Sequence, residues 1–258
     1  MVSFSTVGKA IDYGKRRLVR RQLRQRGKVL QVSQKPVVIF SPHQDDETLG
    51  CGGLIALKRQ QGVPVWVVFL TDGQLCYWAA PEPPPITAEE CIRLRQQEAT
   101  AALDILGVEA SNIVFLDAKD STLSSLAGDQ RQQMVQSLAH WLTVIQPGEV
   151  YVPYYKDQHD DHIATHNLVR DALNEVPLTI ELWQYLVWSL WRYENLADLS
   201  SKQYQGLYSL PIAPVKAQKL AALQAYKSQY IPVVGNFTAL PKTFMGFFDY
   251  PFELFVKA

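Results

Sequence analysis

The 258-residue chain lacks the features that mark several classes of protein. Its three cysteines, Cys51, Cys76 and Cys91, are an odd number without a CxxC pair, so neither a disulfide framework nor a thiolate metal cage is predicted. Lys and Arg number 25, as do Asp and Glu, and this balance excludes a uniformly basic nucleic-acid-binding protein. No stretch has the apolar length of a signal peptide or a membrane span. We therefore expect a globular, cytoplasmic protein.

The even charge balance conceals a basic segment near the start of the chain. Residues 9–28 contain nine basic residues and one acidic residue, Asp12. The more common arrangement of such a segment is a solvated helix whose weakly apolar side packs on the body of the protein. The alternative is an amphipathic helix in peripheral contact with an anionic membrane or a phosphate-bearing partner. We predict a basic helical extension over residues 1–30 and one domain over residues 31–258.

The following part of the chain alternates between short apolar runs and longer amphipathic segments. Runs rich in β-branched or aromatic residues predict buried strands at residues 36–40, 63–70, 112–116 and 149–153. Helices are predicted between them at residues 49–60, 87–106 and 129–145, and Gly107 stands where the second helix should end. This alternation predicts an α/β fold with a mostly parallel sheet.

The last third of the chain is less regular. We predict helices at residues 162–173 and 215–226, and strands at residues 178–188, 206–212 and 252–256. Prolines between residues 81 and 85 fit neither a helix nor a central strand, so residues 73–86 are predicted to form a loop.

Two clusters of histidines and carboxylates follow predicted strands. Residues 41–48 (SPHQDDET) come after the first strand, and residues 154–166 (YYKDQHDDHIATH) come after the fourth. Ligands of doubly wound sheets bind beyond the carboxyl ends of the strands, so we expect the two clusters to share one site. Imidazoles combined with carboxylates suit a divalent ion such as Zn2+, and Fe2+ uses similar ligands.

The spacing within the clusters gives each residue a predicted role. His43 and Asp46 can turn toward one point, which His162 reaches from the second loop, leaving an open position for water. Asp45 points elsewhere and is free to deprotonate that water as a general base. His159 is predicted to polarise the scissile carbonyl or to protonate the leaving amine. Helix capping explains a carboxylate such as Asp46 in one loop, but it explains neither the histidines nor their repetition.

Other features support weaker predictions. The glycines of residues 50–53 lack GxGxxG spacing, so we attribute them to close packing and predict no nucleotide cofactor. Asp72 ends the second strand as either a substrate contact or part of an Asp-Gly turn. Arg95 is a candidate contact for an anion or a sugar, with surface ion pairing as the alternative. Large aromatics are expected to pack in the core, with stacking on sugars as the alternative: Trp183, Tyr185, Trp188, Trp191 and Tyr193.

These motifs resemble those of a known family. The segment SPHQDDETLGCGG is similar to the PHxDDE motif of the LmbE-like superfamily of metal-dependent N-deacetylases, which includes N-acetylglucosaminyl-phosphatidylinositol de-N-acetylase. The segment HDDHIATH resembles its HxDH motif, and RLRQQEATAALDILGV, KDSTL and KLAALQAYKSQ resemble further segments of the family. The resemblance covers about residues 36–256. Gln44 and Asp160 stand where many relatives have proline, which removes a local backbone restraint.

The resemblance implies a Rossmann-like three-layer sandwich that hydrolyses the amide of an N-acetylated amino sugar, free or in a phosphate- or lipid-linked conjugate. It implies that His43, Asp46 and His162 bind the metal and that Asp45 is the general base. It also implies that His159 assists the oxyanion or the leaving group and that Asp161 orients His159. The candidate substrate-binding residues are Asp72, Arg95 and Asp120, the last within KDSTL. Two alternatives stay open: an amidase that cleaves another acyl group or a thiol conjugate, and a non-catalytic module that binds carbohydrate or a lipid surface.

Overall fold

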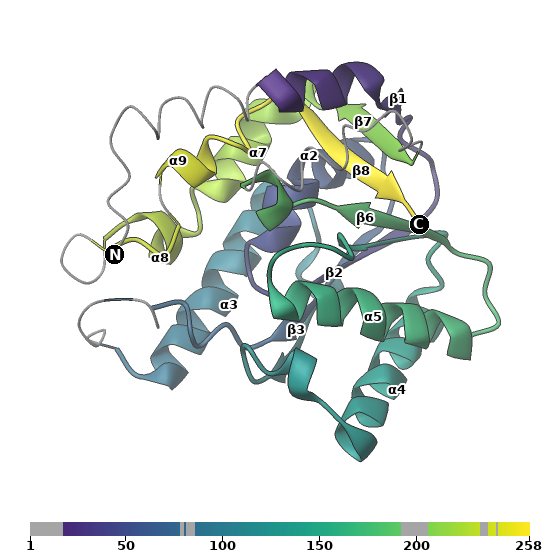
Figure 1. The fold of residues 1–258 in the computed structure, drawn as a ribbon, viewed down its shortest axis with the longest axis vertical. Coiled ribbons are helices and arrows are strands. Elements are labelled where there is room, and N and C mark those ends of the chain that lie inside the picture. The colour runs from purple at the N-terminus through teal and green to yellow at the C-terminus, as the bar shows by residue number, and fades with distance from the viewer. Residues whose placement is uncertain (1–17, 78–79, 81–85, 192–205, 233–236, 241) are drawn as a thin grey trace.

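The computed structural model describes residues 18–77, 80, 86–191, 206–232, 237–240 and 242–258. The described strands form one sheet with the order β1-β7-β8-β6-β5-β2-β3-β4 (Figure 1). The strands are β1 (Lys28–Val29), β2 (Val37–Ser41), β3 (Val65–Thr71), β4 (Ile113–Ala118), β5 (Glu149–Pro153), β6 (Glu181–Tyr185), β7 (Leu207–Pro211) and β8 (Phe252–Lys257). Neighbouring strands are parallel except where β8 pairs with β6 and β7. The predicted mostly parallel α/β sheet is confirmed.

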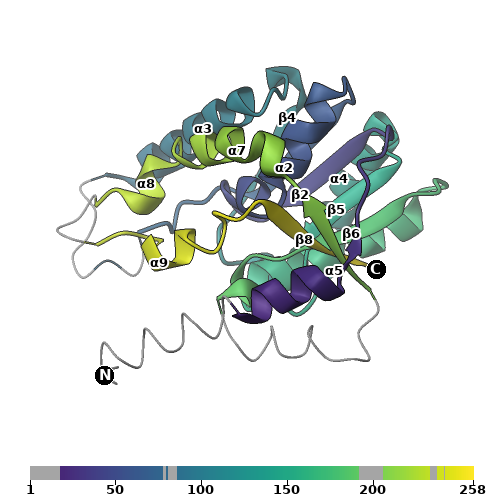
Figure 2. The ribbon, with the colours of Figure 1, turned by 90° about the horizontal axis from the view of Figure 1, so that it is seen from above.

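Helices cover both faces of this sheet. They are α2 (Asp46–Gln60), α3 (Ala88–Ile105), α4 (Gly128–Ile145), α5 (Asp160–Glu175), α7 (Lys216–Leu223), α8 (Lys227–Tyr230) and α9 (Lys242–Met245), with short 3-10 turns η1 (Ala110–Asn112), η2 (Leu123–Ser125), η3 (Trp188–Leu190) and η4 (Ala213–Val215). Helices α4 and α5 pack side by side on one face, and α2, α3 and α7 cover the other (Figures 1 and 2). The expected three-layer sandwich is therefore present.

Alternating side chains of the central strands divide the apolar interior into two cores. Val37 and Ile39 of β2 point into the core beneath α2, α3 and α7, whereas Val38 and Phe40 point into the core beneath α4 and α5. All four are fully buried, because a central parallel strand is covered on both faces. This explains why these strands appear in the sequence as continuous apolar runs.

The order of the strands places the two polar clusters together. Strand β2 has β3 on one side and β5 on the other, so the chain leaves the ends of β2 and β5 at the point where the strand order reverses. Such a switch point leaves room between the loops on the carboxyl side of the sheet. The loops after β2 and β5 carry the predicted site residues.

Some element boundaries differ from the predicted ones. Helix α2 begins at Asp46, inside the polar cluster, and not at residue 49. Strand β6 ends at Tyr185, short of the predicted residue 188, because the Asp157 carboxylate accepts hydrogen bonds from the backbone amides of Trp188 and Ser189 and turns the chain into η3. The predicted loop after β3 lies partly outside the described residues, as does Tyr193.

The glycines at the start of α2 confirm the packing interpretation. A Cβ on Gly50 would lie 2.3 Å from Cδ2 of Tyr185, and one on Gly53 would lie 2.5 Å from Cγ2 of Ile212. Both neighbours are completely buried, so neither can move aside cheaply. Only glycine lets α2 approach the sheet this closely at these positions.

The basic segment is described only from residue 18. Residues 18–26 are helical, with Val19 and Leu23 buried in the core that also contains α2, and β1 then pairs with β7. This agrees with packing of an apolar side on the body of the protein. Residues 9–17 lie outside the described residues, and the domain boundary at residue 30 stays a prediction. No helix in the described ranges is long and apolar enough to cross a membrane.

Candidate metal and catalytic site

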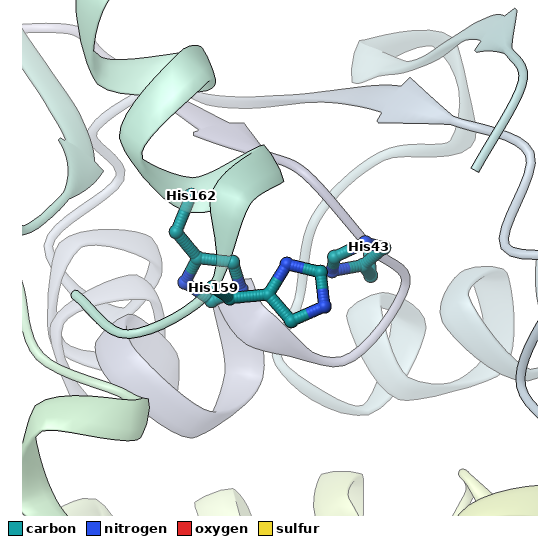
Figure 3. A group of neighbouring side chains, drawn as sticks. All are labelled: His43, His159 and His162. Carbon is teal, nitrogen blue, oxygen red and sulfur yellow. The ribbon is translucent and has the colours of Figure 1, made fainter. Parts of the chain in front are cut away.

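The loops after β2 and β5 border a cavity on the carboxyl side of the sheet. His43, Asp45 and Asp46 come from the first loop and the start of α2, and His159 precedes α5. Figure 3 shows the rings of His43, His159 and His162 gathered where α5 begins. Ligand atoms of these three histidines all lie within 4.8 Å of one another. The structure thus brings His43 to two histidines that lie more than a hundred residues later in the sequence.

The Asp46 carboxylate lies between two of the histidines. Its Oδ2 atom is 3.1 Å from Nδ1 of His43 and 3.0 Å from Nε2 of His162. Asp46 is 3% exposed and His162 is completely buried. The three residues predicted as metal ligands therefore meet around one carboxylate oxygen, in a place with little access for bulk water.

His162 has one nitrogen occupied and one nitrogen free to bind a ligand. Its Nδ1 lies 2.8 Å from the Asp157 carboxylate, whereas its buried Nε2 faces Oδ2 of Asp46 without a well-oriented hydrogen bond among the described residues. A carboxylate on one imidazole nitrogen fixes the tautomer that leaves a lone pair on the other, an arrangement common in metal sites. A metal ion held by both this nitrogen and the Asp46 carboxylate would satisfy the two groups, so the residues present fit one.

The field in the site also favours a cation. Burial by itself would lower the pKa of His162, but the negative charges of Asp46 and Asp157 and the hydrogen bond with Asp157 outweigh burial and raise it to about 9. The pKa of His43 is likewise raised, because the carboxylates around it outweigh its burial. The surplus of carboxylates around these two imidazoles attracts positive charge.

The second nitrogen of His43 faces two further carboxylates. Its Nε2 lies 3.3 Å from Oδ1 of Asp120 and 3.3 Å from Oδ2 of Asp161. His43, Asp120 and Asp161 form a second group whose ligand atoms lie within 4.8 Å of one another. The described residues thus offer more than one set of metal ligands, and His43 belongs to each set.

The Asp45 carboxylate, the predicted base, lies beside Arg95 at the edge of the cavity. Its Oδ2 atom lies 3.5 Å from Nη2 of Arg95, and its carboxylate borders the cavity. Burial, together with the repulsion of Asp46, raises the pKa of Asp45 to about 6 against the opposing charge of Arg95. A carboxyl whose pKa lies near neutrality can both accept and release a proton.

His159 stands at the N-terminus of α5 and lines the same cavity. Its Nδ1 atom accepts a hydrogen bond from the backbone amide of Asp161 at 3.3 Å, so the neutral ring carries its proton on Nε2. Burial, then the charges of His43 and His162, lower the pKa of His159 to about 4. His159 is therefore a neutral hydrogen-bond donor at pH 7.

The Asp161 side chain is not the group that contacts His159. Its carboxylate accepts hydrogen bonds from the backbone amides of Ser121 (2.8 Å) and Leu123 (3.1 Å) and approaches His43. The contact with His159 comes from the backbone amide of Asp161. The described contact through which Asp161 can orient His159 is thus its backbone amide.

The three candidate substrate-binding residues differ in position. Arg95 and Asp120 line the cavity, whereas Asp72 is absent from its described lining. The Asp72 carboxylate instead accepts hydrogen bonds from the backbone amides of Gln74 and Asp120, both at 3.1 Å. Asp72 therefore supports its own turn and the loop that carries Asp120. This position favours the turn over the substrate contact as the role of Asp72.

The remaining cavity wall is partly apolar. The half-buried Trp188 packs against Phe244 with ring centroids 4.8 Å apart, and it stacks near His159 at 6.2 Å. Both aromatics line the cavity. Trp183 and Tyr185 are buried in the core, as expected, and the half-buried Trp191 packs on Phe244 and Phe247. Of the four described aromatics for which stacking on a sugar was considered, Trp188 is the one that lines the cavity, so this contact stays a prediction for Trp188.

Two positions were not anticipated from the sequence. Asp157 lies within the second polar cluster, and only its spacing of five residues before His162 hints at their contact. Gln44, at the proline position of many relatives, is completely buried and donates from Nε2 to the Thr71 carbonyl at 2.6 Å. This hydrogen bond supplies a local restraint on the loop in the absence of a proline ring.

Comparison with known proteins agrees with this geometry. A family model described as GlcNAc-PI de-N-acetylase (PIG-L) matches residues 38–173, a range that includes both polar clusters. Over 198 residues the chain is 28% identical to the probable N-acetyl-alpha-D-glucosaminyl L-malate deacetylase 2 of Bacillus anthracis, an alignment covering 77% of this chain and 83% of that protein.

Solved structures show the same fold. The N,N'-diacetylchitobiose deacetylase of Pyrococcus horikoshii matches with a TM-score of 0.57 and 20% identity, covering 89% of this chain and 82% of that one. The 4-carboxy-2-hydroxymuconate hydratase of Pseudomonas putida KT2440 matches with a TM-score of 0.60 and 24% identity, covering 76% and 80%. Proteins with this fold therefore catalyse at least two kinds of reaction. The reaction of this chain has to be inferred from the residues of its site and not from the fold.

Proposed function

Because the chain belongs to the GlcNAc-PI de-N-acetylase (PIG-L) family, we propose that it is a metal-dependent hydrolase that removes the N-acetyl group from an N-acetylglucosamine-type sugar or its conjugate. The products are acetate and a free amino sugar. The observation that carries this proposal is the meeting of His43, Asp46 and His162 around one carboxylate oxygen, with Asp45 beside them. The deacetylase activity named for the Bacillus anthracis relative supports the same reaction.

The metal ligands in this proposal are His43, Asp46 and His162, and the ion is Zn2+. Two imidazoles and one carboxylate are a common ligand set of catalytic zinc, and Fe2+ is the alternative ion. When bound, the ion polarises the acetyl carbonyl and lowers the pKa of a water molecule. Asp157 holds His162 in the tautomer that can bind.

Asp45 acts as the general base. Its carboxylate borders the cavity and accepts a proton from the attacking water, while Arg95 at 3.5 Å keeps it oriented and partly neutralises it. Because the guanidinium stays charged at all working pH values, the Asp45 carboxyl is the member of this pair that exchanges a proton. The proton can then pass to the leaving amine, which departs as a better leaving group.

His159 stabilises the transition state. With Nδ1 occupied by the Asp161 amide, its Nε2–H is available to donate to the oxygen of the acyl group as negative charge develops there. A neutral imidazole suits this role better than proton delivery, because its lowered pKa keeps it unprotonated at pH 7. Of the two roles considered for His159, support of the oxyanion is therefore the one we propose.

The substrate lies against Arg95, Asp120 and the apolar wall formed by Trp188 and Phe244. A charged side and an aromatic side suit a sugar, whose hydroxyls bond to polar groups and whose C–H face packs on an aromatic ring. We further propose that the sugar is free or in a phosphate- or lipid-linked conjugate, with peripheral membrane contact through residues 9–28 for a lipid-linked substrate.

Acetate release tests the proposed reaction. We would incubate metal-reconstituted protein with N-acetylglucosamine in free, nucleotide-linked, inositol-linked and lipid-linked forms, next to the Asp45→Asn variant. Release from one of these compounds, abolished in the variant, supports both the reaction and the substrate class. Stoichiometric metal with no acetate from any compound would contradict removal of an acetyl group from these sugars and favour another acyl group.

A further inference from the structure

Two cysteines meet at the wall of the cavity, although the sequence suggested no disulfide framework. The Sγ atoms of Cys76 and Cys91 lie 2.8 Å apart, and both residues are free thiols. A disulfide bond is about 2.05 Å long, so only a small side-chain shift separates this pair from bonding distance. Cys76 follows β3 in the loop that lines the cavity, and Cys91 lies in the first turn of α3.

We propose that Cys76 and Cys91 are a reversible dithiol–disulfide pair, a redox-sensitive modification site on the wall of the cavity. The proposal depends on neither the metal nor the deacetylase reaction. Cys76 is partly exposed and can meet a small reagent, whereas Cys91 is buried behind it. The third cysteine, Cys51, is completely buried within α2 and supplies an internal control.

The surroundings favour the thiolate of Cys91. In the dithiol, the hydrogen bond from Cys76 lowers the pKa of the Cys91 thiol; the positive charge of Arg95 acts in the same direction against burial, and it persists after Cys76 is modified. Its place in the first turn of α3 adds the positive end of the helix dipole. Cys91 is therefore suited to attack a modified Cys76.

The chemistry requires a low-molecular-weight disulfide as oxidant. Cys76 gives up its proton to solvent and attacks this disulfide, which forms a mixed disulfide at Cys76 and releases one small thiolate that takes up a proton. The Cys91 thiolate then attacks Sγ of Cys76, forms the internal disulfide and expels the second small thiol. Two protein thiols are oxidised while one small disulfide is reduced to two thiols, and excess small thiol reverses the sequence.

The bond would fix part of the cavity wall. The Cys91 thiol also contacts the Gly73 carbonyl at 3.7 Å, and the Leu75 amide donates to the Asp120 carboxylate at 3.1 Å. A bond from Cys76 to α3 would therefore hold a loop that also supports a carboxylate of the proposed site. The redox state of the pair is thus linked to the wall that contacts the substrate.

Peptide mapping of the wild-type chain tests the pair directly. The protein would be treated with oxidised glutathione, alkylated and cleaved after glutamate, since Glu89 and Glu90 separate the two cysteines. We expect a peptide pair linked through Cys76 and Cys91, the loss of two of three titratable thiols, and recovery of both with dithiothreitol. An unchanged count of three thiols, or glutathione retained on Cys76 without the link, would overturn the proposal.

Two variants separate the steps. In Cys91→Ala, glutathione should stay attached to Cys76, because the attacking thiolate is missing. In Cys51→Ala, the link should form as in the wild type. Equal glutathione adducts in Cys91→Ala and the wild type would show that Cys91 does not resolve the mixed disulfide, and the proposal would fail whether or not the enzyme releases acetate.

Discussion

Asp157 and His162 form a buried pair in which the Oδ2 atom of the carboxylate lies 2.8 Å from Nδ1 of the imidazole. The same carboxylate accepts hydrogen bonds from the backbone amides of Trp188 and Ser189. One side chain therefore fixes both the tautomer of a proposed metal ligand and the position of the turn that carries Trp188 to the cavity. The proposed metal-binding side and the aromatic side of the site are connected through this residue.

The Asp157→Asn substitution should weaken metal binding while the fold persists. An amide no longer supplies the negative charge that makes the His162 imidazole a strong ligand, and loss of such partners typically costs about 10–100-fold in metal affinity. Competition with a chelator of known affinity would measure the change, with circular dichroism as a check on folding. Unchanged affinity would remove Asp157 from the proposed metal site.

The Asp45→Asn substitution should abolish turnover and retain the metal. Removal of a general base typically costs about 10^2–10^4-fold in rate, and Asp45 is not among the proposed ligands. Acetate release and metal content would be measured on the same sample. The matched control is Asp160→Asn, which removes an exposed carboxylate of the second cluster and should leave the rate unchanged. Near-normal activity in Asp45→Asn would assign the base to another group.

The rate should depend on pH through the Asp45 carboxyl. Burial raises its pKa to about 6, so the carboxyl is protonated and inactive as a base below that pH. We expect kcat/KM to fall about tenfold per pH unit below 6 and to level off above it. Metal content must be followed at each pH, because protonation of ligands also releases metal. A profile that stays flat down to pH 4 with metal bound would contradict this role.

The layered fold could be predicted from the sequence because its central strands are covered on both faces. Val37, Val38, Ile39 and Phe40 are all buried, and this produces the unbroken apolar run from which β2 was predicted. The boundary of β6 could not be predicted in this way. It depends on Asp157, whose hydrogen bonds to the amides of Trp188 and Ser189 arise only after β5 and β6 have paired.

The candidate site also contains residues whose position could be predicted from the sequence and residues whose position could not. That His43, Asp46 and His162 lie together could be predicted because their spacing in two loops, each after a strand, points to one edge of the sheet. The carboxylates of Asp120 and Asp161 on the far nitrogen of His43 could not be assigned from spacing. Their position depends on the loop after β4 and on backbone amides that only the folded chain brings together.

The Gly50→Ala substitution should destabilise the protein. The new Cβ would lie 2.3 Å from the Tyr185 ring, which is held in place by a hydrogen bond from its hydroxyl to the Phe40 carbonyl at 3.0 Å. Overpacking typically costs about 1–3 kcal/mol, which outweighs the ~1 kcal/mol that alanine gains over glycine in a helix. Thermal unfolding should show a lower Tm than the wild type.

The control for Gly50→Ala is Gln60→Ala, at an exposed position near the end of the same helix. It tests the effect of alanine in α2 without a new contact in the core, so its Tm should stay within a degree or so of the wild type. An equal or higher Tm for Gly50→Ala would show that α2 can move away from β6 at little cost.

The Trp188→Ala substitution should weaken substrate binding more than it slows chemistry. Trp188 lines the cavity and packs on Phe244, but it carries no group that exchanges a proton. An aromatic contact contributes about 0.5–1.5 kcal/mol, so KM should rise up to about tenfold with kcat little changed. Trp188→Phe should restore most of the loss, and Trp141→Ala, which changes a tryptophan packed on Trp66 away from the cavity, should leave KM unaltered. A fall in kcat at constant KM would instead place Trp188 among the groups that position His159, which it stacks against at 6.2 Å.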